Sequence, residues 1–241
     1  MIDYDVRRHD SIGSTNDEAL RLAREGAAHG TVVCAREQLA GRGRQGRQWH
    51  SPVGNLYVSI LLRPDVAPGQ AATLSFVTAL AVADTVDAFL PGGMHAVLKW
   101  PNDVLVQGAK IAGILLEYAD AAVVVGIGLN IEHTPTGTPY AVTSVRQVIG
   151  LTNTPTATTL LQPLLDAFAR RYCTWQHHGF AATRTAWLAR AHPAGTPLRV
   201  TLGNGQIDGR FSDLAKDGAL IIETPMGQRH IIAGEVVPRP A

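Results

Sequence analysis

Residues 95–131 read HAVLKWPNDVLVQGAKIAGILLEYADAAVVVGIGLNI, and this stretch decides the fold class. Its strand-like runs are separated only by short turns, at 101–103, at 107–108 and at Asp120. Parallel strands need a crossover of a dozen or more residues, so strands this close together must pair as antiparallel hairpins. The stretch therefore predicts a mixed or antiparallel sheet packed on helices, an α+β fold and not a doubly wound one.

The segments before this stretch predict the helices that cover the sheet. Residues 14–30, STNDEALRLAREGAAHG, are typical of a helix that stops at Gly26. Residues 31–37 and 55–64 predict strands, and the almost wholly apolar residues 69–93 predict a long helix in the core.

The segments after it predict a loop, more helix and a small β module. Residues 132–142 are rich in proline, glycine and threonine, and two helical segments should follow over 143–191, with Pro163 in a first helical turn. We expect two domains, residues 1–192 and 193–241, the second a small β-barrel. Its short strands would be separated by turns at 204–205, 217–218 and 226–227.

Composition narrows the class of protein. The chain has 241 residues, 46% hydrophobic and 17% charged, with a formal net charge of +1, so any basic function must be local. The start lacks the apolar region of a signal peptide, and no run approaches the roughly 20 uninterrupted apolar residues of a membrane span. We therefore expect a cytoplasmic protein, with Cys34 and Cys173 as reduced core thiols.

Residues 40–55, AGRGRQGRQWHSPVGN, combine arginine with glycine. Glycine lets a backbone approach a ligand closely, and planar guanidinium groups suit phosphate oxygens. The spacing fits neither a P-loop nor a dinucleotide fingerprint. A flexible linker, a nucleic-acid patch and a loop that closes over phosphates therefore stay open as interpretations, and Trp49 could belong to a ligand site or to the core. The loop residues concerned are Gly41, Arg42, Gly43, Arg44, Gly46 and Arg47.

A second polar group lies on the hairpins. The turn at 101–103 would project Asn102 and Asp103 to one end of the sheet. Lys110 has apolar or small neighbours, so we expect its ammonium to face an enclosed site, where it could neutralise two anions held face to face. A lysine snorkelling at a strand edge is the alternative.

Glycines on the last strands predict a smooth strip on the sheet. Gly126 and Gly128 are two residues apart and so share one face, where they could form the floor of a narrow apolar pocket. Gly113 could let a ligand lie against its strand, and Asn130 could hydrogen-bond a base or sugar. Close packing of the long helix on the sheet explains the glycine pair equally well.

In this order and spacing, the motifs resemble one family, the biotin protein ligases, or biotin–[carboxyl carrier protein] ligases. The resemblance covers nearly the whole chain, and GRGRxGRxW with KWPND is its most specific part. The matching segments are STND (14–17), REQLAGRGRQGRQWHSP (36–52), KWPNDVLV (99–106), KIAGILLE (110–117) and VGIGLNI (125–131).

The resemblance implies a class II synthetase-like catalytic domain, an SH3-like C-terminal barrel and a two-step reaction. The carboxylate of biotin would attack the α-phosphate of ATP, giving biotinyl-5′-AMP and pyrophosphate. The ε-amine of a lysine on a biotin carboxyl carrier domain, such as that of acetyl-CoA carboxylase, would then attack the activated carbonyl. The enzyme must supply positive charge and exclude water, because two anions meet in the first step.

The resemblance also implies roles for individual residues. Lys110 and Arg42 would be catalytic, with Lys110 between the carboxylate and the α-phosphate, and Asp103 would be an outer ligand of Mg²⁺. The biotin-binding residues would be Ser14, Thr15, Asn16, Gln38, Gly41, Arg42, Gly43, Arg44, Lys110, Gly113, Gly126 and Gly128. The adenylate-binding residues would be Arg44, Arg47, Trp49, Asn102 and Asn130.

The sequence departs from the family pattern at two points, and two other functions stay open. Gln45 stands where many members carry a further arginine, so one phosphate contact is absent or replaced. Some members begin with a DNA-binding domain, whereas Ser14 lies near the start here, so we expect no DNA partner; we expect no membrane partner either, and a homodimer stays open. A lipoate-type ligase would use the same chemistry, but a polar set including Gln38 suits a ureido group better. A nucleic-acid-binding module, from a different class, would not explain Lys110.

Overall fold

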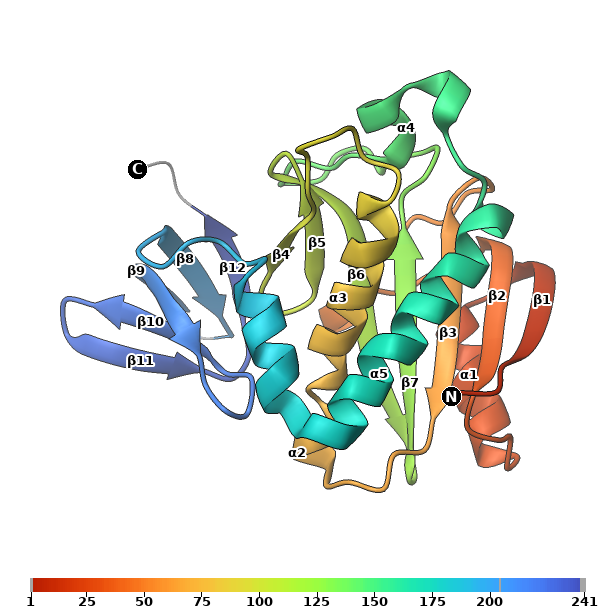
Figure 1. Ribbon diagram of the computed structural model, residues 1–241, viewed down its shortest axis with the longest axis horizontal. Coiled ribbons are helices and arrows are strands. Elements are labelled where there is room, and N and C mark those ends of the chain that lie inside the picture. Colours follow the sequence, from red (N-terminus) through yellow and green to blue (C-terminus); the bar gives the residue numbers. More distant parts are fainter. Residues whose placement is uncertain (1, 204, 239–241) are drawn as a thin grey trace.

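A seven-stranded sheet forms the centre of the protein in the computed structural model, which describes residues 2–203 and 205–238 (Figure 1). Its strands are β1 (Asp5–Ile12), β2 (Thr31–Gln38), β3 (Leu56–Leu62), β4 (Val97–Lys99), β5 (Asp103–Val106), β6 (Ala109–Ala119) and β7 (Ala122–Leu129). They lie in the order β1-β2-β3-β7-β6-β5-β4. β1 and β2 run parallel, and the other neighbouring pairs are antiparallel. The predicted mixed sheet is confirmed.

The tight turns of the predicted hairpins join these strands. Gln107 and Gly108, between β5 and β6, have φ of 52° and 78°, the conformation that a two-residue hairpin turn requires. Asp120, between β6 and β7, has φ of 50°. β1 was not predicted, because this edge strand is mostly exposed and polar and carries little apolar alternation.

Helices cover both faces of the sheet. They are α1 (Thr15–Arg24), α2 (Pro68–Ala71), α3 (Leu74–Asp87), α4 (Val145–Ile149) and α5 (Ala157–Leu188), with 3₁₀ turns at Arg44–Gly46 and Leu151–Asn153. Figure 1 shows α3 and α5 side by side on one face, and α1 packs on the other through Ala19, Leu20, Leu22 and Ala23. The Ser14 side chain caps α1 by accepting a hydrogen bond from the amide of Asp17.

Two helix predictions need correction. The helix predicted over 69–93 is divided into α2 and α3 and ends at Asp87. Pro163 lies inside α5, not in a first turn. The neighbouring buried leucines of α5, such as Leu160 and Leu164, pack into the core, and this burial outweighs the hydrogen bond that proline cannot donate.

The alternation along β7 separates the core from the opposite face. Val123, Val125, Ile127 and Leu129 belong to the core that contains α3 and α5, whereas Ala122 and Val124 pack with α1. Gly126 and Gly128 continue the α1 face. The long helix α3 therefore lies on the other side of the sheet, and its packing does not explain these glycines.

The C-terminal residues form a separate five-stranded antiparallel sheet. Its strands are β8 (Pro197–Leu202), β9 (Gly205–Leu214), β10 (Leu220–Thr224), β11 (Gly227–Ile231) and β12 (Glu235–Pro238), in the order β11-β10-β9-β8-β12. The predicted turns at 217–218 and 226–227 separate these strands, whereas Asn204 and residues 239–241 lie outside the described residues. We keep the boundary near residue 193 as a proposal.

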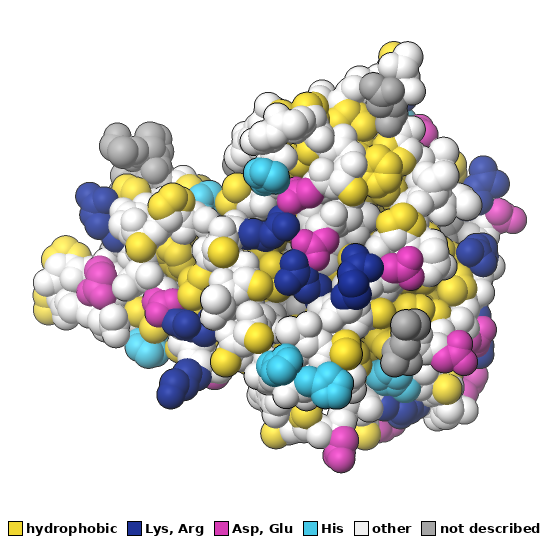
Figure 2. Space-filling model, in the orientation of Figure 1, with side chains coloured by type: hydrophobic (Ala, Val, Ile, Leu, Met, Phe, Trp, Pro, Cys, Tyr) yellow, Lys and Arg dark blue, Asp and Glu magenta, His cyan; other side chains and the backbone are white. Residues whose placement is uncertain are grey.

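Two further sequence expectations concern the surface. Cys34 is buried as predicted, but Cys173 is exposed on α5, so its assignment to the core is wrong. The segment Pro68–Asp87 is apolar and long enough to cross a membrane by composition alone, yet it is mostly buried inside the protein. Figure 2 shows basic and acidic side chains interspersed over the visible face, in keeping with the small net charge.

Candidate functional site

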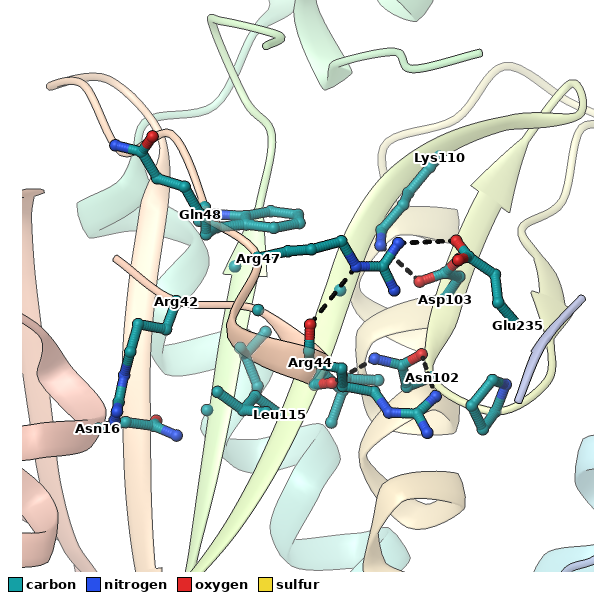
Figure 3. Close-up of a pocket in the computed structure, with 18 of the residues that line it drawn as sticks. Asn16, Arg42, Arg44, Arg47, Gln48, Asn102, Asp103, Lys110, Leu115 and Glu235 are labelled. Atoms are coloured by element: carbon teal, nitrogen blue, oxygen red, sulfur yellow. Dashed lines mark hydrogen bonds and ion pairs between the residues drawn. The ribbon is translucent and has the colours of Figure 1, made fainter. Parts of the chain in front are cut away.

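A cavity lies on the α1 face of the large sheet, where the arginine-rich loop crosses it (Figure 3). Its walls come from the start of α1, the end of β2, the loop, the β4–β5 turn, β6, β7 and the start of β12. The predicted residues that line it are Ser14, Thr15, Asn16, Gln38, Arg42, Gly43, Arg44, Arg47, Trp49, Asn102, Asp103, Lys110, Gly113, Gly126 and Gly128. Lining residues without a predicted role include Lys99, Tyr140, Gly234 and Glu235.

A β-bulge turns Lys110 toward this cavity. Asp103 pairs with Gly113, but the register shifts after Val104, so that Leu105 pairs with Lys110. Partners across an antiparallel pair share a face, and the extra residue in β6 therefore places both Lys110 and Gly113 on the side of Asp103. Without the bulge, strict alternation would put these two residues on opposite faces.

Asp103 bridges two lysines at one end of the cavity. Its Oδ1 lies 2.6 Å from Nζ of Lys110 and its Oδ2 lies 2.8 Å from Nζ of Lys99, with all three side chains at most 13% exposed. Burial by itself would raise the pKa of the Asp103 carboxyl, but Lys110 and Lys99 hold that pKa below its usual value. Lys110 is thus an enclosed, paired lysine, and the snorkelling alternative is wrong.

A hydrogen-bond network at the other end fixes two predicted polar residues. The backbone N–H and the hydroxyl of Thr15 donate to Oε1 of Gln38, at 2.8 Å and 3.0 Å. Nε2 of Gln38 donates to the hydroxyl of Ser51 at 2.9 Å. These bonds orient the Gln38 amide at the mouth of the glycine strip.

Asn16 is fixed in the same way by two residues that the sequence reading missed. Ser59 of β3 donates to Oδ1 of Asn16 at 2.6 Å, and Nδ2 of Asn16 donates to Glu117 of β6 at 2.7 Å. A Cβ on Gly126 would lie only 2.2 Å from Oδ1 of Asn16. The two-residue alternation of β3 and β6 could have placed Ser59 and Glu117 on this face.

The three loop arginines point to different partners (Figure 3). Arg42 pairs with Asp17 and Glu117, away from Lys110. Arg44 donates to the carbonyl oxygen of Gly234 at 3.4 Å and faces Asn102.

Arg47 connects the loop to the C-terminal sheet, since its Nη1 lies 2.8 Å from Glu235. The hydrogen bond to Glu235 raises the pKa of Arg47, whereas burial lowers that of Arg44. Gly41 does not line the cavity, but a Cβ there would lie 2.5 Å from the Ser51 hydroxyl and from the Trp49 carbonyl oxygen. Gly41 therefore allows the close turn at the start of the loop.

Trp49 lies over the glycine floor. A Cβ on Gly128 would lie 2.4 Å from its Nε1, and one on Gly113 would lie 3.0 Å from its Cζ3. Nζ of Lys110 is 5.3 Å from the ring centre, within the range of a cation–π contact. Nε1 is buried against this floor and has no hydrogen-bond partner among the described residues, so a ligand would reach this donor only after the indole shifts.

The predicted asparagines are placed differently. Asn102 lines the cavity, and its Nδ2 donates to the carbonyl oxygen of Ile114 at 2.6 Å. Asn130 is buried outside the lining, and its Nδ2 donates to the carbonyl oxygen of Thr143 at 3.1 Å. The predicted contact between Asn130 and a nucleotide stays a prediction.

The sequence matches two family models. Residues 9–131 match the biotin/lipoate A/B protein ligase family. The chain belongs to this family. Residues 195–239 match the biotin protein ligase C-terminal domain, which in this ligase follows the catalytic sheet.

Similar ligases are known from several bacteria. The chain is 42% identical to a biotin–[acetyl-CoA-carboxylase] ligase of Paracoccus denitrificans, over 92% of this chain and 96% of that one. It is 33% identical to the bifunctional ligase/repressor BirA of Bacillus subtilis (strain 168), over 95% of this chain and 72% of that one. The biotin protein ligase from Aquifex aeolicus, solved in complex with biotin and ATP, superimposes with a TM-score of 0.85 at 27% identity, over 98% of this chain and 99% of that one. The predicted fold class is confirmed.

Proposed function

We propose that this member of the family is an ATP-dependent biotin–[carboxyl carrier protein] ligase that works in the cytoplasm. The observation that carries the proposal is a single cavity with a polar end at Thr15, Asn16 and Gln38, a glycine floor, and a largely enclosed ammonium at Lys110. The names of the Paracoccus ligase and of the Aquifex complex with biotin and ATP support the same substrates.

Biotin would lie along the floor with its carboxylate toward Lys110. Its ureido ring needs donors and acceptors, which Thr15, Asn16 and Gln38 offer at the far end. Gly126 and Gly128 add no side chains to this floor, but Asn16 and Trp49 lie directly against it, so the apolar ring and chain of biotin would enter only as Trp49 shifts with its loop.

The nucleotide would lie at the end where the loop meets the C-terminal sheet. Arg44 and Arg47 offer guanidinium groups to the phosphates, and Asn102 offers a polar contact to the adenosine. Trp49 would contact the adenosine only once its indole leaves the glycine floor. Arg47 would have to exchange Glu235 for phosphate on binding.

The first step joins two anions. A carboxylate oxygen of biotin attacks the α-phosphorus of ATP, the bond to the bridging oxygen of the β-phosphate breaks, and pyrophosphate leaves with the electron pair. Lys110 would lower the repulsion by contacting the carboxylate and the α-phosphate together. In the second step the neutral ε-amine of the acceptor lysine attacks the acyl carbon, AMP leaves with its electron pair, and the amide loses a proton.

Arg42 is engaged away from Lys110 in this structure, and Asp103 is occupied by two lysines. Arg42 could contact the reacting groups only after leaving Asp17 and Glu117. Both carboxylate oxygens of Asp103 contact lysines, and the described residues contain no cluster of three His, Cys, Asp or Glu side chains that could hold a metal. The chain's own residues do not fit a protein-held ion, so we propose that magnesium arrives bound to ATP, as part of the substrate.

A carboxyl carrier domain is the proposed acceptor, as the name of the Paracoccus ligase suggests. Lipoate is the alternative acid, because the family includes lipoate ligases. The match to the biotin protein ligase C-terminal domain favours biotin, as does the polar end of the cavity, whose groups suit a ureido ring better than an apolar one. A homodimer and DNA binding form no part of this proposal.

The test is biotin-dependent exchange of labelled pyrophosphate into ATP. We expect exchange with the wild-type chain and a loss of about 100-fold or more in Lys110→Ala, the scale expected when a charge-stabilising group is removed. Lys216→Ala is the matched control, because Lys216 is exposed on the C-terminal module. Exchange stimulated by lipoate and not by biotin would overturn the assignment.

A further inference from the structure

Lys99 is a cavity residue to which neither the motifs nor the proposed function assign a role. It is the last residue of β4 and pairs in register with Asp103, the first residue of β5. Its side chain is 11% exposed, and its Nζ lies 2.8 Å from Oδ2 of Asp103. Lysine is seldom buried to this degree without a reason in charge or function.

The carboxylate of Asp103 is shared by two ammonium groups. Asp103 also binds Lys110, and among the described residues neither lysine has another ion-pair partner. The trio therefore keeps an excess positive charge inside a cavity wall, where water solvates it poorly. Tyr140 covers both groups, with Nζ of Lys99 6.0 Å and Nζ of Lys110 5.6 Å from its ring centre.

The surroundings of Lys99 match a polyanion. Arg44 and Arg47 line the same end of the cavity, close enough to Asp103 for its charge to favour their cationic forms. This end thus holds more basic groups than carboxylates, since Asp103 and Glu235 are the acids that line it in the described part of the chain. Biotin carries a single negative charge, which the ammonium of Lys110 can neutralise without a second lysine.

We propose that Lys99 is a second substrate-binding ammonium, which contacts phosphate oxygens of ATP and then of the leaving pyrophosphate, while Asp103 positions it beside Lys110. The proposal rests on the proposed ligase function. In the adenylation step, negative charge grows on the β-phosphate oxygen as the bond to the α-phosphorus breaks, and an ammonium at this point stabilises it. The transfer step involves no pyrophosphate and does not need Lys99.

The two half-reactions give a test that separates these roles. In Lys99→Met, the remaining Lys110 and Asp103 form a neutral pair. We expect the KM for ATP and the inhibition constant of pyrophosphate to rise about 10- to 100-fold, the value of one charge-assisted hydrogen bond. The KM for biotin and the rate of transfer from added biotinyl-5′-AMP to the carrier domain should stay within about twofold.

Matched variants complete the design. Lys216→Met makes the same change at an exposed lysine. It should leave the KM for ATP, the inhibition constant of pyrophosphate, the KM for biotin and the rate of transfer unchanged. Lys99→Arg keeps the charge and should recover most of the affinity for pyrophosphate. Lys99→Gln keeps a polar side chain and should behave like Lys99→Met, so it serves if that variant does not fold.

Three outcomes are decisive. Unchanged affinity for ATP and pyrophosphate in a folded Lys99→Met or Lys99→Gln variant would show that Lys99 does not bind phosphate. If the rate of adenylation and the rate of transfer fall by the same factor, Lys99 has a structural role instead. If the wild-type chain catalyses no biotin-dependent exchange, the ligase function itself is refuted. This outcome is measured on the wild type alone, so it is distinct from a failure of the role proposed for Lys99, which is measured on the variants.

Discussion

At the scale of single residues, Asp103 sets the charge balance of the cavity. Its carboxylate lies between Lys99 and Lys110, and each of its oxygens contacts one of them. Its removal would leave two largely enclosed ammoniums near each other without this counter-charge, which is more costly than the loss of an exposed ion pair.

Asp103→Asn is therefore expected to destabilise the folded chain by about 3 kcal/mol or more. Urea unfolding at low salt would measure the loss, with the exposed Asp65→Asn as control. Added pyrophosphate should stabilise the variant more than the wild type, because it replaces the missing negative charge. Equal stability of Asp103→Asn and wild type without added anion would contradict the assigned role.

The contribution of Asp103 should depend on pH in a defined direction. Because lysines hold its folded-state pKa below the usual value, the stabilisation is complete above the ordinary aspartate pKa of about 4 and is lost as pH falls through the lower, folded-state pKa. The stability difference between wild type and Asp103→Asn should consequently shrink in acid. A difference that grew below pH 4 would argue against this pairing.

At the scale of elements, β7 has two different faces. Its odd-numbered residues pack in the core that contains α3 and α5. Its even-numbered residues face α1, and the last two of them, Gly126 and Gly128, form the glycine floor of the cavity. The strand thus anchors the sheet and forms the cavity at once, since successive side chains of a strand point to opposite sides.

Gly128→Ala should impair ligand binding more than folding. The new Cβ would lie 2.4 Å from Nε1 of Trp49, so the indole and its loop must shift. We expect the KM for biotin and ATP to rise about tenfold or more, as one misplaced contact group costs about 1.4 kcal/mol or more. Gly92→Ala is the control, because its Cβ would meet nothing within 4 Å. Unchanged KM values in Gly128→Ala would show that the ligands do not depend on the position of Trp49.

At the scale of the whole molecule, the C-terminal sheet closes the cavity that the large sheet begins. Gly234 and Glu235 meet the loop arginines, and Nε1 of Trp100 donates to the carbonyl oxygen of Gly218 at 3.0 Å. The loop itself is held by backbone bonds from Gly43 to Arg47 and from Trp49 to Gly41. The C-terminal module thus takes part in the site, and is more than an appended domain.

Glu235→Gln should loosen the loop by releasing Arg47. We expect faster tryptic cleavage at the arginines of 42–47 in the free protein, and protection by biotin with ATP in both wild type and variant. Glu223→Gln, which alters an exposed glutamate of the same sheet, is the control. Identical cleavage of the two variants would mean that the Arg47–Glu235 pair does not restrain the loop.

The sequence by itself determined the mixed sheet and the hairpin turns, and its resemblance to a family named most of the residues around the cavity. Short spacing forces antiparallel pairing, and period-two alternation assigns Gly126 and Gly128 to one face. Such local rules could not find Lys99 as the partner of Asp103: KWPND includes this lysine but does not say what its side chain contacts.

Only the tertiary structure decided which side chains meet. The bulge in β6 turns Lys110 to the face of Asp103, against strict alternation. Glu235 reaches Arg47 across 188 positions of the sequence, and Glu117 receives Arg42 in the same way. Contacts of this kind depend on the register of strand pairing and on how the two sheets pack, and spacing along the chain does not encode either. Hairpins and alternation could be predicted because they depend on residues that are near neighbours in the sequence.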